Sequence, residues 1–318
     1  MVLAFIAFVN VQLGSVYIPF NILFEALVEP DLTNQATYVI LYEYRIPKVI
    51  TAILAGAGLS VSGLLMQSLF KNPLAGPYVL GISNGATLGV ALATMLGGRL
   101  ASSLTVIGSA MLGSVGVLLL VLFMSRWIAN SVTLLIVGLM IGSATGALVS
   151  VLQYYSDAEV VQSFLIWTFG SLSGVTRSDL WLFAAIIVLG IVFSYLHQKP
   201  LNAMLLGERY AQSMGVNTKS TRYRLVIITG IVIGTITSYC GPIAFVGLAV
   251  PHMSRLIANT VNHRTLILFS ALIGAILMLV CDTIAQLPGT DGVLPINVVT
   301  VLLGAPVVVW LVLKYRSI

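Results

Sequence analysis

Apolar runs of about 20 residues recur along this chain, and they constrain its fold more than any other feature. A membrane-spanning helix needs roughly 20 predominantly apolar residues, whereas strands of a membrane barrel alternate apolar and polar residues. The runs here are continuous, and 8% of the residues are charged, against about 25% in soluble domains. We therefore predict an all-α, polytopic membrane protein of about ten transmembrane helices, folded as one domain over residues 1–318. The runs lie at about 1–13, 48–69, 78–97, 102–124, 132–154, 180–197, 224–240, 243–259, 266–286 and 294–313.

Two of these runs leave alternatives open. Residues 1–13 are few for a span and lack the basic start and small-residue cleavage site of a signal peptide. We interpret them as a first span whose beginning is short or missing. The runs at 224–240 and 243–259 are separated only by Gly241 and Pro242, which predicts either two spans or one span and a re-entrant segment.

The basic residues favour two spans there and predict an orientation. With ten spans and the N-terminus inside, 11 of the 15 Lys and Arg residues lie inside and 4 outside, as the positive-inside rule requires. We predict a multi-pass protein of the cytoplasmic (inner) membrane with both termini in the cytoplasm. The basic residues on the outer side would be Arg45, Lys48, Arg99 and Arg177, and the acidic ones Glu25, Glu29, Asp31, Glu43, Asp157, Glu159, Asp179 and Asp291.

Glycines recur every fourth residue at Gly138, Gly142 and Gly146. Small residues at this spacing line one face of a helix and let two backbones approach closely in lipid. The pattern predicts helix packing, which is either static or part of a moving interface.

Several kinds of chemistry lack their sequence signatures. The chain has no G-x-x-x-x-G-K-[ST] phosphate loop, no CxxC and no HExxH. We find no nucleophile–base or metal-binding pattern and therefore predict a protein that is not an enzyme and needs no cofactor. The net charge of +5 reflects orientation in the membrane, so no nucleic-acid partner is expected.

Asp282 lies within a predicted span, near its outer end, and is the best candidate for an ionisable group at membrane depth. Such a group merits a functional hypothesis because a charge at the membrane centre costs about 2.5–3.5 kcal/mol. It is either the coupling residue of an ion-gradient-driven secondary transporter or a carboxylate near a helix end that bonds a neighbouring helix.

The inner loop at about 199–222 mixes apolar and polar residues and predicts two short helices around Gly207. These helices would either bind a partner in the cytoplasm or lie on the lipid surface. On the outer side, Arg45 and Lys48 flank Pro47 at the start of a span. Two cations oppose the dipole there, so we expect a negative group beside them: lipid phosphate, Glu43 or an acidic partner.

Taken together, five blocks make the chain resemble the FecCD-like permeases of ABC importers for iron–siderophores, haem and cobalamin. The resemblance covers about residues 13–316. The blocks are RIPK at 45–48, GAGLSVSGLLMQSLFKNPLAGPYVLGISNGA at 56–86, LGERYAQSMGV at 206–216, GPIAFVGLAVPHMSRL at 241–256 and LPINVVTVLLGAPVVVWLVLK at 294–314.

This resemblance implies the permease fold of a type II ABC importer, a homodimer with a substrate pathway along its axis. Two copies of a separate ATPase would bind inside and one extracytoplasmic substrate-binding protein outside. Arg45 and Lys48 would dock the binding protein, with Lys48 in place of the usual arginine and Gln286 where some members have another. The ATPase-coupling residues would be Leu206, Gly207, Glu208, Arg209, Ala211, Met214 and Gly215, and the gate residues Asn72, Leu74, Asn130 and Ser131.

The function that follows is ATP-driven import of a metal chelate, with ferric siderophore first and haem, cobalamin or molybdate as alternatives. A turn with a helix start at Pro77 explains the prolines near Asn72 equally well without a gate. An ion-gradient-driven transporter remains the competing class.

Overall fold

A computed structural model describes residues 1–13, 18–19, 35–97, 102–128, 130–286 and 293–315. Every regular element in these ranges is helical, as predicted. Arg99, Arg316, Glu25, Glu29, Asp31 and Asp291, whose sides of the membrane the sequence predicts, lie outside the described residues. The elements are α1 (Val2–Gln12), α3 (Gln35–Val39), η2 (Ile40–Arg45), α4 (Ile46–Phe70), η3 (Pro77–Leu80), α5 (Ile82–Gly97), α6 (Ser103–Ser125), α7 (Ser131–Tyr154), α8 (Ala158–Thr168), η5 (Leu172–Gly174), α9 (Leu180–Leu196), α10 (Gln198–Leu205), α11 (Glu208–Ser213), α12 (Thr218–Cys240), α13 (Val246–Ala258), α14 (His263–Ala285) and α15 (Ile296–Tyr315).

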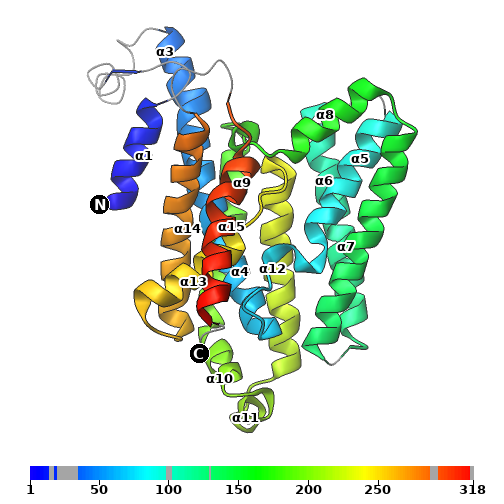
Figure 1. Cartoon of the computed structure of the whole chain (residues 1–318), viewed down its shortest axis with the longest axis vertical. Helices are drawn as coiled ribbons and strands as arrows, with labels where there is room; N and C mark the ends of the chain where they lie inside the picture. Colours follow the sequence, from blue (N-terminus) through cyan, green and yellow to red (C-terminus); the bar gives the residue numbers. More distant parts are fainter. Residues whose placement is uncertain (14–17, 20–34, 98–101, 129, 287–292, 316–318) are drawn as a thin grey trace.

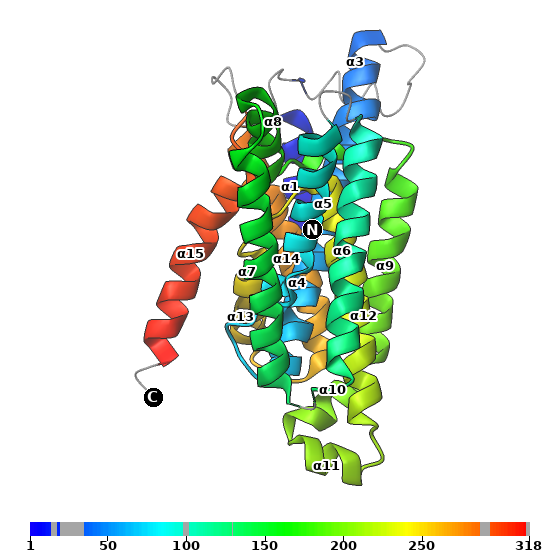
Figure 2. The same ribbon diagram turned by 90° about the vertical axis from the view of Figure 1, so that its right-hand side faces the viewer.

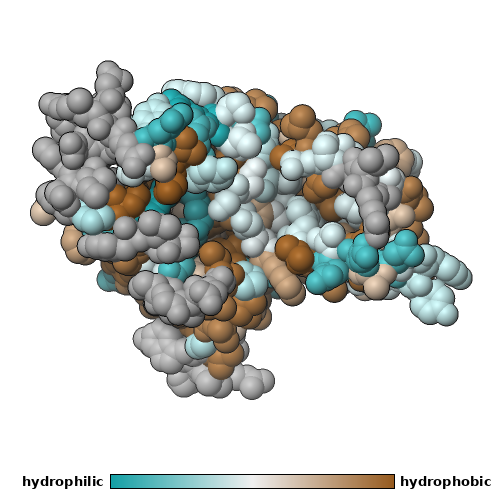
Figure 3. Space-filling model, turned by 90° about the horizontal axis from the view of Figure 1, so that it is seen from above, coloured by the Kyte–Doolittle hydropathy of each residue, from teal (hydrophilic) through white to brown (hydrophobic). Residues whose placement is uncertain are grey.

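The long helices stand side by side in one bundle (Figure 1). The short helices α10 and α11 project from one end, where the described chain also ends, and α3 and α8 lie at the opposite end. Seen from above, polar and neutral residues fill much of the middle of the α3–α8 end, and hydrophobic residues lie mainly around its edge (Figure 3). We call the α10–α11 end the inner end and the opposite one the outer end.

Each of the ten predicted runs contains a helix, but not all are long enough to cross alone. Five helices in the described part of the chain are long and apolar enough to span a membrane, or up to six if the bent pair α9 and α10 counts as one. Three further apolar helices are shorter: Val2–Gln12, Ile82–Gly97 and Ile296–Val309. Helix α13 has 13 residues, about 20 Å at 1.5 Å per residue, which is less than the hydrocarbon thickness.

Helix α4 forms the centre of the bundle, with α9, α12, α13 and α14 packed around it. Its small residues allow this. A Cβ on Gly56 would lie 2.7 Å from the Cβ of Met278, and one on Gly63 would overlap the backbone at Gly247. Ser60 Oγ also donates to the backbone oxygen of Ser270 at 2.7 Å. Backbones in contact replace side-chain packing here, as is typical in lipid.

The return from α12 to the inner end begins with irregular backbone and continues as α13. The last helical bond of α12 is made by the nitrogen of Gly241, and the first of α13 by the oxygen of Phe245. The chain between them is not helical, and such backbone is tolerated at membrane depth only where protein surrounds it. Tyr78 supplies the partners: its hydroxyl accepts from the backbone nitrogen of Ile243 at 3.0 Å and donates to the oxygen of the same residue. Asn297 Oδ1 accepts from the nitrogen of Ala244 at 3.1 Å. Residues 241–258 thus lead the chain from the outer end of α12 to the inner end (Figure 1), which agrees with the two-crossing interpretation.

The predicted glycine face of α7 is packed over only part of its length. A Cβ on Gly138 would lie 2.5 Å from the backbone oxygen of Val79, and one on Gly142 would lie 2.8 Å from the side chain of Asn84. Outside the backbone of α7 itself, no atom of the described residues lies within 4 Å of such a Cβ on Gly146. Gly138 and Gly142 therefore contact η3 and α5, whereas Gly146 faces open space within one copy.

Gly138→Ala is expected to lower stability by about 1–3 kcal/mol, because the new methyl group meets rigid backbone and the helices must move apart. Gly146→Ala is the matched control. It should change stability by no more than about 1 kcal/mol and can raise it, since alanine is the better helix former. Unfolding of the purified protein in detergent, followed by circular dichroism, measures both. Equal destabilisation of the two variants would contradict the packing described here.

Candidate functional site

Two short helices meet at Gly207 on the inner end, as the sequence predicts. Helix α10 ends at Leu205 and α11 begins at Glu208. Gly207 between them has φ +117° and ψ 150°, a region that is essentially restricted to glycine. Its backbone oxygen accepts from the nitrogen of Ala211 at 2.9 Å and so starts α11. The angle between the two helices therefore depends on a backbone conformation that no other residue adopts readily.

The far end of α11 is closed by a Schellman motif. The nitrogen of Val216 donates to the oxygen of Ala211 at 3.0 Å, and the nitrogen of Gly215 donates to the oxygen of Gln212 at 2.9 Å. Gly215 has φ +83°, as glycine at this position usually does. Ala211 is fully buried and packs with Ala203, Met204 and Val216. Ala211 is thus part of the packing within the helix pair, and Gly215, which is exposed, ends α11.

The outward side of the pair is apolar and exposed. Met214 is 60% exposed, Leu206 68% and Tyr210 51%, and Arg209 lies beside them at the surface. Glu208 pairs with Arg222 at the start of α12, with 2.6 Å between Oε1 and Nη2. Large apolar side chains that project beyond the bundle are typical of a protein contact, and the ion pair fixes α11 to a long helix.

The predicted gate residue Asn72 has a local structural role. Lys71 ends α4 in the left-handed region at φ 48°. Asn72 Oδ1 then accepts from the backbone nitrogen of Leu74 at 2.9 Å, the Asx turn that asparagine favours. His252 Nε2 lies 2.8 Å from the oxygen of Pro73 and holds this turn to α13. Leu74 is 47% exposed.

Asn130 and Ser131 begin α7, also at the inner end. Asn130 Oδ1 accepts from the nitrogen of Val132 at 2.8 Å and caps the helix, a common use of asparagine. The side chain of Ser131 lies outside what the structure describes. The turn at Asn72 and the cap at Asn130 account for both asparagines, and their role as a gate stays a prediction.

The two predicted docking cations do not lie free at the outer surface. Lys48 Nζ pairs with Asp282 Oδ1 at 2.9 Å, and the two side chains are 15% and 3% exposed. Arg45 Nη1 donates to the backbone oxygens of Val11 at 2.6 Å and Gln12 at 3.0 Å. The expected negative group beside Lys48 is therefore Asp282, which none of the three predicted candidates included. Direct docking by Arg45 and Lys48 stays a prediction.

Asp282 is correspondingly a carboxylate that bonds neighbouring helices, the second of the two predicted alternatives. Besides Lys48 of α4, it accepts from Asn10 Nδ2 of α1 at 3.1 Å and from the side chain of Gln286. Glu43, predicted as a partner of the outer cations, instead binds Arg177 at 2.8 Å. The sequence offered one signal for the Lys48–Asp282 pair, namely two opposite charges near the outer ends of their helices.

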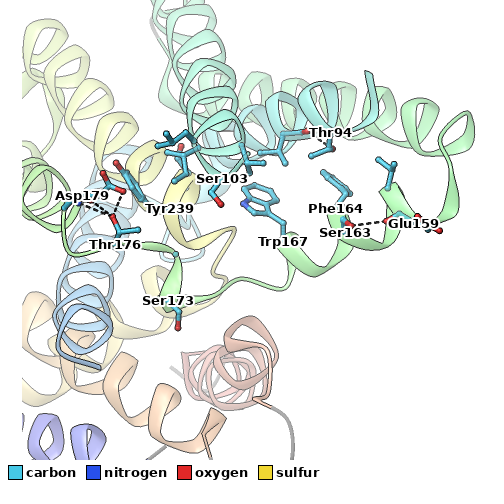
Figure 4. A pocket seen from close by; sticks show the side chains of 18 residues that line it. Thr94, Ser103, Glu159, Ser163, Phe164, Trp167, Ser173, Thr176, Asp179 and Tyr239 are labelled. Carbon is cyan, nitrogen blue, oxygen red and sulfur yellow. Dashed lines mark hydrogen bonds between the residues drawn. The ribbon is translucent and has the colours of Figure 1, made fainter. Parts of the chain in front are cut away.

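A cavity of about 850 Å³ opens at the outer end between α5, α6, α8 and α12. Figure 4 shows Phe164 and Trp167 rising from α8 toward α5 and α6, with Tyr239 beside Asp179. Thr176 Oγ1 donates to Asp179 Oδ2 at 2.8 Å along its edge. None of the predicted site residues lines it, and no sequence pattern indicated it, because its walls come from five separate segments.

Comparison with known proteins identifies the family. The FecCD transport family matches residues 2–314. The chain belongs to this family. Among curated FecCD-like relatives, the hemin transport system permease protein HmuU of Yersinia pestis is 34% identical, with 100% of this chain and 94% of that protein covered. The vitamin B12 import system permease protein BtuC of Salmonella typhi is 38% identical, with 86% and 83% covered.

Solved structures agree with this FecCD assignment. An inward-facing metal-chelate type ABC transporter superposes with a TM-score of 0.86 at 29% identity, covering 98% of this chain and 96% of the other. The PsaBC complex of Streptococcus pneumoniae, with a TM-score of 0.62 at 19% identity, shares the fold. The predicted fold and the predicted class, a non-enzymatic permease subunit of an ABC importer, are confirmed.

Proposed function

We propose that two copies of this chain form the membrane part of an importer for a metal chelate, with iron–siderophore as the first candidate cargo. Two copies of a separate ATPase bind the inner end, and one extracytoplasmic binding protein delivers cargo at the outer end. Both termini of the chain lie in the cytoplasm. The surface formed by Leu206, Arg209, Tyr210 and Met214 is the observation that carries this proposal, since it presents exposed apolar side chains on a fixed helix pair.

The exposed face of α7 supports the pairing of two copies. This face carries Ser143, Gly146, Ala147 and Ser150 among its exposed residues. Small and hydroxyl-bearing residues gain little from contact with lipid tails, but they let two helices approach closely. A Cβ built on Gly146 meets no described atom outside its own helix within one copy, so this position would then contact the second.

Two observations support a chelate as cargo: the names of the relatives, and the absence of charged residues in α7 and in α15 from Ile296 to Val309. The two relatives named above carry hemin and vitamin B12 in their names, and a similar solved transporter is described as metal-chelate type. Neither α7 from Ser131 to Tyr154 nor α15 from Ile296 to Val309 contains a charged residue. A pathway bounded by these helices would not hold a charged chelate by ion pairing.

The test is uptake by proteoliposomes that contain this protein, its ATPase and its binding protein. We expect the permease to co-purify with the ATPase and to hydrolyse no ATP by itself. Uptake should need ATP and the binding protein, and ferric siderophore, haem and cobalamin should be compared side by side. Uptake driven by a proton or sodium gradient without the ATPase would overturn the proposal.

A charge-reversal experiment tests the outer cations separately. If Arg45 and Lys48 dock the binding protein, Arg45→Glu with Lys48→Glu weakens its affinity most at low salt, where screening is least. Their burial leads us to expect loss of folded protein instead, with little change in the affinity of whatever remains folded. Surface plasmon resonance on the folded fraction distinguishes the two results.

A further inference from the structure

A smaller cavity at the inner end is lined by two basic residues and by no acidic residue. It measures about 320 Å³ and lies where the end of α4 meets α10, α13 and the start of α14. Lys71 and Arg255 line it together with Gln67, Ser68 and His263, and none of the residues lining it is acidic. Two cations facing one small cavity without a carboxylate among its walls favour an anion.

Hydrogen bonds fix the polar wall of this inner cavity. Arg255 Nη1 donates to Gln67 Oε1 at 2.7 Å, and Gln67 Nε2 donates to the oxygen of Leu248 at 3.2 Å. The amide is therefore held with its oxygen toward the guanidinium, which sets where that cation lies. Lys71 is exposed at the end of α4, so its amine reaches the cavity from the aqueous side.

His263 contributes polar ring nitrogens to the edge of the cavity. Its Nδ1 lies 2.8 Å from Asn202 Oδ1, and an amide oxygen only accepts, so Nδ1 carries the proton. Its Nε2 lies 2.7 Å from Ser68 Oγ, and that hydroxyl donates to the backbone oxygen of Leu64 at 2.8 Å. His263 is also the first residue of the 23-residue helix α14, whose positive N-terminal dipole favours an anion nearby.

The remaining walls are apolar. Val261 is 68% exposed and Leu205 47%, and both line the cavity with Met204 and Leu266. A basic pocket between transmembrane helices on the cytoplasmic side, bordered by apolar side chains, has the chemistry that binds the headgroup of an anionic phospholipid. We propose that the inner cavity binds a phosphate-bearing anion, the headgroup phosphate of an anionic phospholipid from the inner leaflet.

Such a ligand would touch the helix that leads to Gly207. Met204 and Leu205 belong to α10, and Asn202 of the same helix bonds His263. A lipid bound between α4 and α10 would stabilise one position of the helix pair. This regulatory consequence rests on the proposed function, whereas the binding site does not.

Native mass spectrometry of the purified protein, titrated with phosphatidylglycerol, tests the site. Lys71→Gln is expected to weaken binding about fivefold, the factor expected from about 1 kcal/mol per basic residue near an anionic surface. Lys219→Gln is the matched control, since Lys219 is an exposed lysine of the inner end that does not line the cavity. Arg255→Lys keeps the charge and should bind better than Arg255→Gln. Thermal unfolding without lipid shows which variants remain folded.

Further measurements distinguish the headgroup of an anionic phospholipid from free phosphate. Phosphatidylcholine, which has a phosphate but no net charge, should bind more weakly than phosphatidylglycerol and should not respond to Lys71→Gln. Equal losses in Lys71→Gln and Lys219→Gln would overturn the site in favour of general surface charge. Binding of inorganic phosphate that depends on Lys71, without such dependence for phosphatidylglycerol, would overturn the lipid as its source. Uptake assays are not needed, so failure here leaves the proposed transport function untouched.

Discussion

Replacing Asp282 with asparagine is expected to destabilise the protein by about 3–5 kcal/mol, the cost of removing one partner of a buried ion pair. Lys48 Nζ lies 2.9 Å from Asp282 Oδ1, and its side chain is only 15% exposed, so the ammonium group would lose its counter-ion in a poorly hydrated place. The amide also cannot accept from Asn10 and compensate Lys48 at the same time. Chemical unfolding in detergent, followed by helical circular dichroism, measures the loss.

The double variant decides whether the pair itself is responsible. Lys48→Met with Asp282→Leu removes both charges and keeps similar volume, and such replacements of buried pairs are often neutral or stabilising. We expect the double variant to be more stable than either single variant. Losses that simply add would show that the two residues act independently and would contradict the pairing.

The same variants separate two mechanisms of transport. In an ion-gradient-driven transporter the Asp282 carboxylate would carry the coupling ion, and no second substitution could replace it. If its role is to bond α14 to α4 and α1, the double variant should retain ATP-driven uptake in proportion to the folded protein. This comparison needs only uptake per folded molecule for the wild type and the double variant.

Local patterns predicted helices more reliably than partners. The apolar runs identified every long helix, because lipid requires about 20 apolar residues wherever a helix crosses. They did not predict that α13 would have only 13 residues and follow a stretch of non-helical backbone. That backbone depends on Tyr78 and Asn297, which are distant in sequence, so no local pattern could reveal the break.

The candidate site shows the same limit. The two short helices around Gly207 followed from the sequence pattern alone. Burial of Lys48 and its bond to Asp282 did not, because the pair joins helices far apart in the sequence. A charge near a helix end looks the same in the sequence whether it faces water or another helix.

Gly207→Ala is expected to reduce ATP-driven uptake at least about tenfold while leaving the bundle and the dimer intact. At φ +117° and ψ 150° a side chain costs about 1–3 kcal/mol, and about 1.4 kcal/mol changes an equilibrium tenfold. Apart from Gly207 and its two chain neighbours, no atom of the described residues lies within 4 Å of a Cβ built at Gly207, so the penalty comes from the backbone. The chain can relieve it only by changing the angle between α10 and α11, and thus the surface offered to the ATPase.

Two further substitutions locate the cause. Gly215→Asn is the control, because φ +83° lies near a left-handed conformation that asparagine tolerates, and uptake should fall little. Glu208→Lys places a second cation against Arg222, which now pairs with Glu208 at 2.6 Å, and should impair uptake as Gly207→Ala does. ATP hydrolysis and uptake are measured on the same proteoliposomes, with dimer content from size-exclusion chromatography. Gly207→Ala changes the angle between α10 and α11, whereas Glu208→Lys breaks the ion pair that joins α11 to α12. Normal uptake in both variants would therefore show that the ATPase moves the membrane helices through another contact.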